Sequence, residues 1–333
     1  MVLHGCTQTA IGYALGSDWL MLAEELGFAL LLPEQRRVNN RNGCFNWFKP
    51  DDAERDCGEA RSICQMIDHM VADHDLDQSR IFVTGLSAGG AMAAVMLATY
   101  PEVFAGGAIL AGLPYKCAST AIQALACMRR ARSLPPAEWG DLVRQASPHR
   151  GPWPRVSIWH GTRDRVVALE SSLELVKQWT DVHEVAHMAP VEDVVDGHAR
   201  WTYRNATGIA VVEALAIAEL DHGIPVDPAC GGRPADFILE ADIHSTHHIA
   251  KFWDLAAVRP VVSAVPVAPA PGIVVTPLEP QPDPVLAEEA VPDLPPAAVE
   301  PAAAAVLQPE RCLPFLDRLR QRIGAWLDQI RRR

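Results

Sequence analysis

Five consecutive residues, Gly85-Leu86-Ser87-Ala88-Gly89, form a G-x-S-x-G motif. The motif follows a β-type run over 80–84 and precedes a helical stretch rich in small residues, which is the strand-turn-helix context of an activated serine. Glycines at its two ends let the strained turn approach the neighbouring strand and helix. The same five residues could also form an ordinary tight turn, so the interpretation of Ser87 as a nucleophile depends on finding a base and an acid for it.

A serine hydroxyl is a weak nucleophile at its own pKa and needs a base within hydrogen-bond reach, oriented by an acid. Asp164 comes soon after a predicted strand over 156–159, and His222 follows the last β-rich run. Taken alone, either residue also fits a polar group of a surface loop. The order serine, aspartate, histidine and the position of all three after strands favour Ser87 as nucleophile, Asp164 as orienting acid and His222 as general base.

Other histidines fit the role of base less well. His247 and His248 fall on a predicted helix. His160 precedes Asp164 by only four residues, and we expect that spacing to keep it from serving as the partner of that carboxylate. His222 therefore remains the predicted base.

The loop that follows the first predicted strand, over 1–3, begins His4-Gly5-Cys6. The tetrahedral intermediate of acyl transfer needs backbone N–H donors, and we expect them to come from Cys6 and Ala88. The Cys6 side chain either packs or forms a disulfide, and Cys44 is a candidate partner because its loop follows the neighbouring predicted strand.

Three aromatic residues, Phe45, Trp47 and Phe48, lie close together on a predicted loop. Such a cluster favours an apolar pocket for an acyl or aryl group beside the donor loop, and core packing is the alternative. We therefore take these residues as candidate substrate-binding groups.

These residues require a scaffold, and the chain up to about residue 255 alternates short β-type runs with helical segments. That alternation predicts a mostly parallel sheet flanked by helices. An Asn205–Gly208 turn between two β-rich runs predicts a hairpin near the end of the sheet. Strands are expected at 1–3, 28–32, 80–84, 107–110, 156–159 and 209–217, and helices at 18–26, 59–74, 88–100, 136–146, 169–179 and 245–255.

Composition divides the chain into a catalytic domain over 1–258, a Pro/Ala-rich linker over 259–309 and a basic amphipathic helix over 310–333. Apolar residues recur in the last segment at three- and four-residue steps among arginines. Such a helix suits an anionic membrane or an apolar particle surface, while docking onto its own domain or self-association produces the same pattern.

Charge and cysteine content limit the other classes of function. The formal net charge of -12 argues against a nucleic-acid partner. The eight cysteines include no C-x-x-C pair and no closely spaced Cys/His quartet, so we expect no metal site. The start of the chain shows no signal peptide, and no apolar run reaches the roughly 18 residues of a membrane span.

These ordered motifs resemble the polyhydroxybutyrate (PHB) depolymerase family of α/β-hydrolase esterases, which includes feruloyl- and acetylxylan-esterase-like enzymes. The resemblance extends from residue 1 to about 258. It is carried by segments beginning at Leu3, Leu32, Cys44, Gly85, Ala111, Ile158, Gln178, Asp221 and Ile249, among them Leu3-His4-Gly5-Cys6-Thr7-Gln8 and Asp221-His222-Gly223.

The resemblance implies cofactor-free hydrolysis of poly- or oligo-3-hydroxyalkanoate or related short acyl esters. It assigns Ser87, Asp164 and His222 to the catalytic triad and Cys6 with Ala88 to the oxyanion hole. A feruloyl or acetylxylan esterase acting on plant polysaccharide is the alternative. A rival of another class is a catalytically inactive protein attached to a granule or membrane surface through 310–333.

The chain departs from the family pattern at its start, because relatives usually carry strands before the one that ends in Leu3-His4-Gly5. We therefore expect an α/β-hydrolase fold that lacks its first N-terminal strands, with 28–32 at an exposed sheet edge. Frequent export in the family implies an extracellular location. A cytoplasmic one is the alternative.

Overall fold

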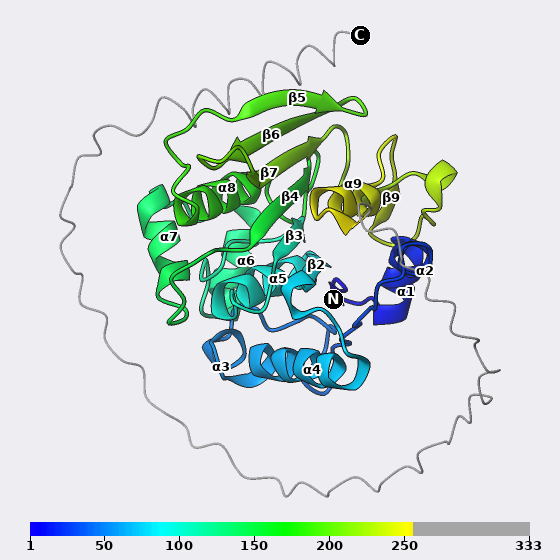
Figure 1. The fold of residues 1–333 in the computed structure, drawn as a ribbon, viewed down its shortest axis with the longest axis horizontal. Coiled ribbons are helices and arrows are strands. Elements are labelled where there is room, and N and C mark those ends of the chain that lie inside the picture. Colours follow the sequence, from blue (N-terminus) through cyan, green and yellow to red (C-terminus); the bar gives the residue numbers. More distant parts are fainter. Residues whose placement is uncertain (256–333) are drawn as a thin grey trace, which may run out of the picture. The chain divides into compact units, whose positions relative to one another are not determined.

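The computed structural model describes residues 1–255, which build a mostly parallel sheet flanked by helices (Figure 1). Within these residues the main sheet has seven strands in the order β1-β2-β3-β4-β7-β6-β5. β1 to β4 and β7 run parallel, whereas β6 pairs antiparallel with β7 and with β5. The strands are β1 (Val2–Leu3), β2 (Phe82–Leu86), β3 (Gly106–Leu110), β4 (Arg155–Gly161), β5 (Val191–Val195), β6 (His198–Arg204) and β7 (Ala210–Ile217).

Helices pack against this sheet, and a small parallel pair of strands follows β7. The pair consists of β8 (Ile224–Val226) and β9 (Ile238–Glu240). The α-helices are α1 (Ala10–Gly16), α2 (Trp19–Leu26), α3 (Pro50–Ala53), α4 (Gly58–His74), α5 (Ala88–Thr99), α6 (Ala121–Arg129), α7 (Pro136–Arg144), α8 (Glu170–Val182) and α9 (Ser245–Phe252); two 3-10 turns cover Gln78–Arg80 and Pro228–Cys230.

Helix α5 lies at the centre of the fold, packed on β2 and β3. All of its residues are buried, which agrees with a sequence that is apolar or small on every face. Parallel strands covered on both sides have the same character, because neither face meets water. Trp159 of β4 is fully buried, as are Trp139 and Trp179. The core therefore fixes the strands that lead into the predicted site.

The segment over 28–32 is a correction to the predicted strands, because the structure assigns no strand there. It runs beside β1 and receives a hydrogen bond from Val2 N to Leu31 O at 2.9 Å. Phe28, Leu30 and Leu32 are partly buried against the core. Since β1 offers only two paired residues, this apolar run stays extended without forming a ladder.

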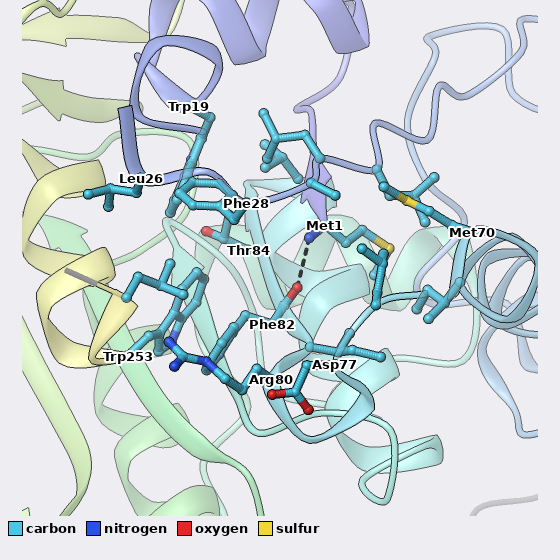
Figure 2. Close-up of a pocket in the computed structure, with 18 of the residues that line it drawn as sticks. Met1, Trp19, Leu26, Phe28, Met70, Asp77, Arg80, Phe82, Thr84 and Trp253 are labelled. Atoms are coloured by element: carbon cyan, nitrogen blue, oxygen red, sulfur yellow. Dashed lines mark hydrogen bonds between the residues drawn. The ribbon is translucent and has the colours of Figure 1, made fainter. Parts of the chain in front are cut away.

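An apolar pocket of about 370 Å³ lies next to β1 (Figure 2). Its lining includes Trp19, Phe28, Phe82 and Trp253, and the amino group of Met1 donates a hydrogen bond to Phe82 O at 2.8 Å. No member of the predicted triad lines this pocket, so it is separate from the candidate site.

The predicted linker over 259–309 and the predicted helix over 310–333 lie outside the described residues. Among residues 1–255, no helix combines the length and the apolar character needed to cross a bilayer.

Candidate active site

Ser87 lies on a sharp turn between β2 and α5. Its backbone angles, φ 57° and ψ −115°, are strained for a residue with a side chain. The flanking glycines make the turn feasible: a Cβ at Gly85 would lie 2.3 Å from Gly89 O, and a Cβ at Gly89 would lie 2.3 Å from Leu3 O. The G-x-S-x-G motif therefore has the strand-turn-helix context that the sequence predicted.

The structure brings the three predicted catalytic side chains into direct contact. His222 Nε2 lies 2.9 Å from Ser87 Oγ, and His222 Nδ1 lies 2.7 Å from Asp164 Oδ2. They follow β2, β4 and β7, whose parallel directions place their carboxyl ends at one edge of the sheet. His222 is 7% exposed, and the Asp164 side chain is fully buried.

The contacts of Asp164 define the tautomer of the histidine. A carboxylate at Nδ1 accepts the N–H of that nitrogen, which leaves Nε2 free to accept the serine proton. The other carboxylate oxygen, Oδ1, accepts hydrogen bonds from the backbone N–H groups of Val166 and Val167, both at 2.8 Å. Asp164 is therefore held from both sides.

His160 contacts this carboxylate too, which corrects the expectation that its spacing would prevent such a contact. Its Nε2 lies 3.3 Å from Asp164 Oδ2 and 2.9 Å from Val167 O. The chain turns back immediately after β4, with Asp164 N bonded to Gly161 O, so four residues suffice. Burial raises the pKa of Asp164, but hydrogen bonds from His160 and His222 outweigh it and hold the pKa well below its usual range.

The predicted donor loop runs along the turn that carries Ser87. A Cβ at Gly5 would lie 3.5 Å from Leu86 O. The buried His4 ring accepts a hydrogen bond from Gln35 N at Nε2, 3.1 Å away, and its Nδ1 donates to Gly5 O at 2.7 Å. Neither Cys6 N nor Ala88 N has a hydrogen-bond acceptor among residues 1–255.

A disulfide joins Cys6 to Cys44, with their Cα atoms 4.2 Å apart, which confirms the pairing proposed from the sequence. Next to it, Thr7 N donates to Asn42 O at 2.9 Å. The donor loop is thus tied covalently and by a backbone hydrogen bond to the loop that carries the aromatic cluster.

The three aromatic residues do not lie in one environment. Phe45 is buried in the core with its ring centroid 5.1 Å from that of His4. Trp47 and Phe48 instead line a pocket of about 720 Å³, together with Tyr115 and other residues, and no member of the predicted triad lines it. The candidate substrate-binding groups are therefore divided between core packing and a cavity.

Glu59 at the start of α4 organises the aromatic loop, and sequence reasoning missed it. Its Oε2 accepts from Asn46 N at 2.8 Å, and its Oε1 accepts from Asn46 Nδ2 at 2.6 Å and from Gln35 Nε2 at 2.5 Å. Burial raises the pKa of Glu59 against the opposing effect of these bonds. A glutamate in the first turn of a helix is common at surfaces, so nothing in the sequence marked this one.

Known proteins share the fold and much of the sequence. The described fold is similar to an acetyl xylan esterase from Aspergillus awamori, with a TM-score of 0.65, 22% sequence identity and coverage of 76% of this chain and 87% of that one. The sequence is 45% identical over 260 residues to a poly(3-hydroxyalkanoate) depolymerase C of Paucimonas lemoignei, covering 77% of this chain and 63% of the relative.

A second relative, an acetylxylan esterase of Coprinopsis cinerea, is 31% identical over 231 residues, covering 68% of this chain and 61% of the relative. The chain thus spans about three fifths of the length of these two curated relatives. The family model described as esterase PHB depolymerase matches residues 1–189, more than half of the chain. The protein therefore belongs to the esterase PHB depolymerase family.

Proposed function

We propose that the protein is a carboxylic-ester hydrolase that forms an acyl-enzyme on Ser87. The observation that carries this proposal is the continuous set of contacts from Ser87 Oγ through His222 to Asp164, at 2.9 and 2.7 Å. Nucleophile, base and orienting acid in such contact are the requirements for activating a serine hydroxyl. The same contacts favour catalysis over an inactive surface-binding protein.

In the first half of the reaction, Ser87 Oγ attacks the ester carbonyl and its proton passes to His222 Nε2. The N–H groups of Cys6 and Ala88 stabilise the oxyanion of the tetrahedral intermediate. His222 then protonates the departing alcohol as the carbon–oxygen bond breaks. In the second half, His222 takes a proton from water, which attacks the acyl-enzyme and releases the acid with Ser87 restored.

Asp164 supports both halves by remaining ionised. Hydrogen bonds from two histidines and two backbone N–H groups keep its carboxylate charged in a buried position. A fixed negative charge at Nδ1 stabilises the imidazolium that forms when His222 accepts the serine proton. No cofactor takes part in this scheme.

As substrate we propose esters of poly- or oligo-3-hydroxyalkanoate. The 45% identity to a poly(3-hydroxyalkanoate) depolymerase exceeds the 31% identity to an acetylxylan esterase, which supports this class over plant polysaccharide. Trp47 and Phe48 are the groups we propose to contact the apolar part of the substrate, because the Cys6–Cys44 disulfide ties their loop to the proposed donor loop. Phe45 would contribute by holding the loop.

We propose an extracellular location, since the Cys6–Cys44 disulfide requires an oxidising environment to persist. That bond links the loop of a proposed oxyanion donor to the loop that carries Trp47 and Phe48. Oxidation would thus be needed for a fully ordered site.

The assignment is tested by measuring hydrolysis of p-nitrophenyl butyrate by the purified chain and by Ser87→Ala, with folding checked by circular dichroism. Loss of a triad member usually removes several orders of magnitude in rate. Ser79→Ala, at an exposed 3-10 turn, is the matched control and should leave the rate unchanged. A folded wild-type chain that is inert would overturn the proposal.

Substrate class is tested on the same protein with 3-hydroxybutyrate oligomers, acetylated xylan and methyl ferulate. The proposal expects the highest kcat/KM on the oligomers. A preference for acetylated xylan or methyl ferulate would retain the esterase and reject the polyester substrate.

A further inference from the structure

A second group of polar side chains gathers where the corner between α1 and α2 meets the start of α9. Asp18 occupies the corner with a left-handed backbone, φ 67°. His244 is the N-cap of α9, and His247 lies in its first turn. One ligand atom from each of the three lies within 4.8 Å of the other two. Because Asp18 is more than 200 residues from both histidines in the chain, a search for closely spaced ligands could not detect this group.

Two of the three side chains, Asp18 and His244, are buried, and the third, His247, is partly exposed to solvent. His247 Nε2 lies 3.2 Å from Asp18 Oδ2. The imidazole rings of His244 and His247 are nearly parallel, with centroids 4.3 Å apart. Asp18 and His244 are each 4% exposed, whereas the His247 side chain is 37% exposed. An ion from solvent would therefore enter beside His247.

His244 is the member of the group that an ordinary ion pair does not explain. Neither of its ring nitrogens has a hydrogen-bond partner among residues 1–255, although both are buried. Buried polar atoms are nearly always satisfied, and an exception calls for a ligand, water or a functional role. An ion pair between His247 and Asp18 alone would leave both nitrogens unsatisfied.

The covering loop, residues 227–237 between β8 and β9, lies over this group and leaves room at His244 Nε2 and Asp18 Oδ2. A Cβ at Gly232 would lie 3.2 Å from His244 Nε2, and a Cβ at Gly231 would lie 2.7 Å from Asp18 Oδ2. Two glycines in succession thus keep side chains away from two of the three ligand groups. Asp227, at the start of the same loop, interacts electrostatically with both histidines and adds negative charge nearby.

We propose that Asp18, His244 and His247 bind a divalent transition-metal ion of the Zn²⁺ class. Two imidazoles and one carboxylate are a donor set that suits Zn²⁺, with water completing a tetrahedron. The buried, unpartnered His244 and the cover of glycines support an ion over a simple ion pair. This proposal is independent of ester hydrolysis at Ser87.

The ion would cross-link elements that come together from distant parts of the chain. Thr246 Oγ1 already donates to Ser17 O at 2.6 Å, and Arg233 N donates to Gly16 O at 3.0 Å. β8 begins two residues after His222 and leads into the covering loop. Metal binding would therefore stabilise the segment after the catalytic histidine, and because binding to the folded state adds to stability, it should raise Tm.

The test uses the full-length chain without an affinity tag, stripped of metal by a chelator and titrated with Zn²⁺ by calorimetry. We expect one ion per chain and a higher Tm. Asp18→Asn and His247→Ala should each weaken binding by at least about tenfold. Asparagine tolerates the left-handed backbone at position 18, so the first variant removes charge without adding strain.

His69→Gln is the control, because it removes a solvent-exposed histidine that lies 3.3 Å from Asp73 on α4. It should bind Zn²⁺ like the wild-type chain. Co²⁺ binding to the wild-type chain is a second measurement that needs no variant, because the visible spectrum of bound Co²⁺ reports tetrahedral coordination. Absence of Zn²⁺ and Co²⁺ binding, unchanged affinity in folded Asp18→Asn and His247→Ala, or a cobalt–thiolate band showing binding at a cysteine would each overturn the proposal.

Discussion

Ser87 combines a strained backbone with a side chain that is hydrogen-bonded to His222, its proposed base. Its positive φ persists because Gly85 and Gly89 allow close approach of the surrounding backbone, and α5 behind it is buried along its whole length. Strain held by a well-packed environment is typical of active sites, where it fixes the reacting group in place. The hydroxyl is thereby presented to His222 at 2.9 Å.

His160 supplies a prediction at this scale. His160→Leu removes one hydrogen-bond donor from Asp164, so kcat should fall by about ten- to a hundredfold, the range seen when a residue that orients a metal-binding side chain is removed, with KM unchanged. Steady-state kinetics on p-nitrophenyl butyrate measures both parameters. His160→Gln, whose amide nitrogen carries two N–H groups for Val167 O and Asp164 Oδ2, should recover part of kcat. A folded His160→Leu protein with wild-type kcat would show that this contact has no catalytic role.

At the scale of elements, the sequence predicted the central strands and the long helices because their burial leaves a clear pattern. β4 is buried from Val156 to Gly161 and lies between two parallel neighbours. The short helices α1, α3 and α6 were not predicted, and α6 exposes Ile122 and Leu125, which blurs its periodicity. The run over 28–32 has strand-like residues but no adequate pairing partner, and context decides such cases.

Prediction of the candidate active site from sequence has the same limit, because contacts that depend on tertiary context leave no sequence pattern. Ser87, Asp164 and His222 could be predicted because a short motif and the order of strand ends are written along the chain. The contacts of His160 with Asp164, and of Glu59 with Asn46, depend on how loops fold back and are not encoded in spacing. Sequence patterns therefore predict the contact of Ser87, His222 and Asp164 more readily than the contacts that hold these side chains in place.

The disulfide between two loops gives a prediction about elements. Cys44→Ser opens a covalent link between positions 38 residues apart, so the free energy of unfolding should fall by about 2–4 kcal/mol. Chemical denaturation measures the change, and reductant should reproduce it in the wild-type chain. Cys57→Ser, at an exposed free thiol, should leave stability unchanged. Equal stability of wild type and Cys44→Ser would contradict the structural role of this bond.

The β4–β7 ladder places Glu213 opposite Ser157, whose hydroxyl donates to Glu213 Oε1 at 2.6 Å. Burial raises the pKa of Glu213 to about 7 in spite of that bond. Between its ordinary pKa of 4.5 and about 7 the folded state binds the extra proton, so stability decreases as pH rises through this window.

Glu213→Gln removes the titrating group and should remove this dependence. Between pH 5 and 8, the wild-type free energy of unfolding should fall relative to the variant by on the order of 2–3 kcal/mol. Urea denaturation of both proteins at several pH values provides the measurement. Parallel pH profiles for the two proteins would contradict a raised pKa at this position.

At the scale of the whole molecule, the described residues form a hydrophobic core to which α9 and its end contribute. The Trp253 ring stacks on Phe82 and on Trp19, with centroids 4.9 and 5.7 Å apart. Any shortened chain must therefore retain residues up to Leu255.

A chain ending at residue 260 should keep the kcat/KM of the full chain on p-nitrophenyl butyrate, because every proposed catalytic group lies before that point. Its binding to PHB granules in a sedimentation assay should decrease if the basic amphipathic segment over 310–333 attaches to polymer. Trp326→Ala in the full chain is a second test of the same segment: granule binding should decrease and kcat/KM should stay unchanged. Unchanged granule binding by the shortened chain would assign attachment to residues 1–260.

The most direct test of the central claim is to treat the protein with an organophosphate that labels activated serines and to map the adduct by peptide mass spectrometry. The account predicts one adduct, on Ser87, formed in step with loss of ester hydrolysis and absent from Ser87→Ala. An adduct on a different serine, or full hydrolysis by folded Ser87→Ala, would contradict it.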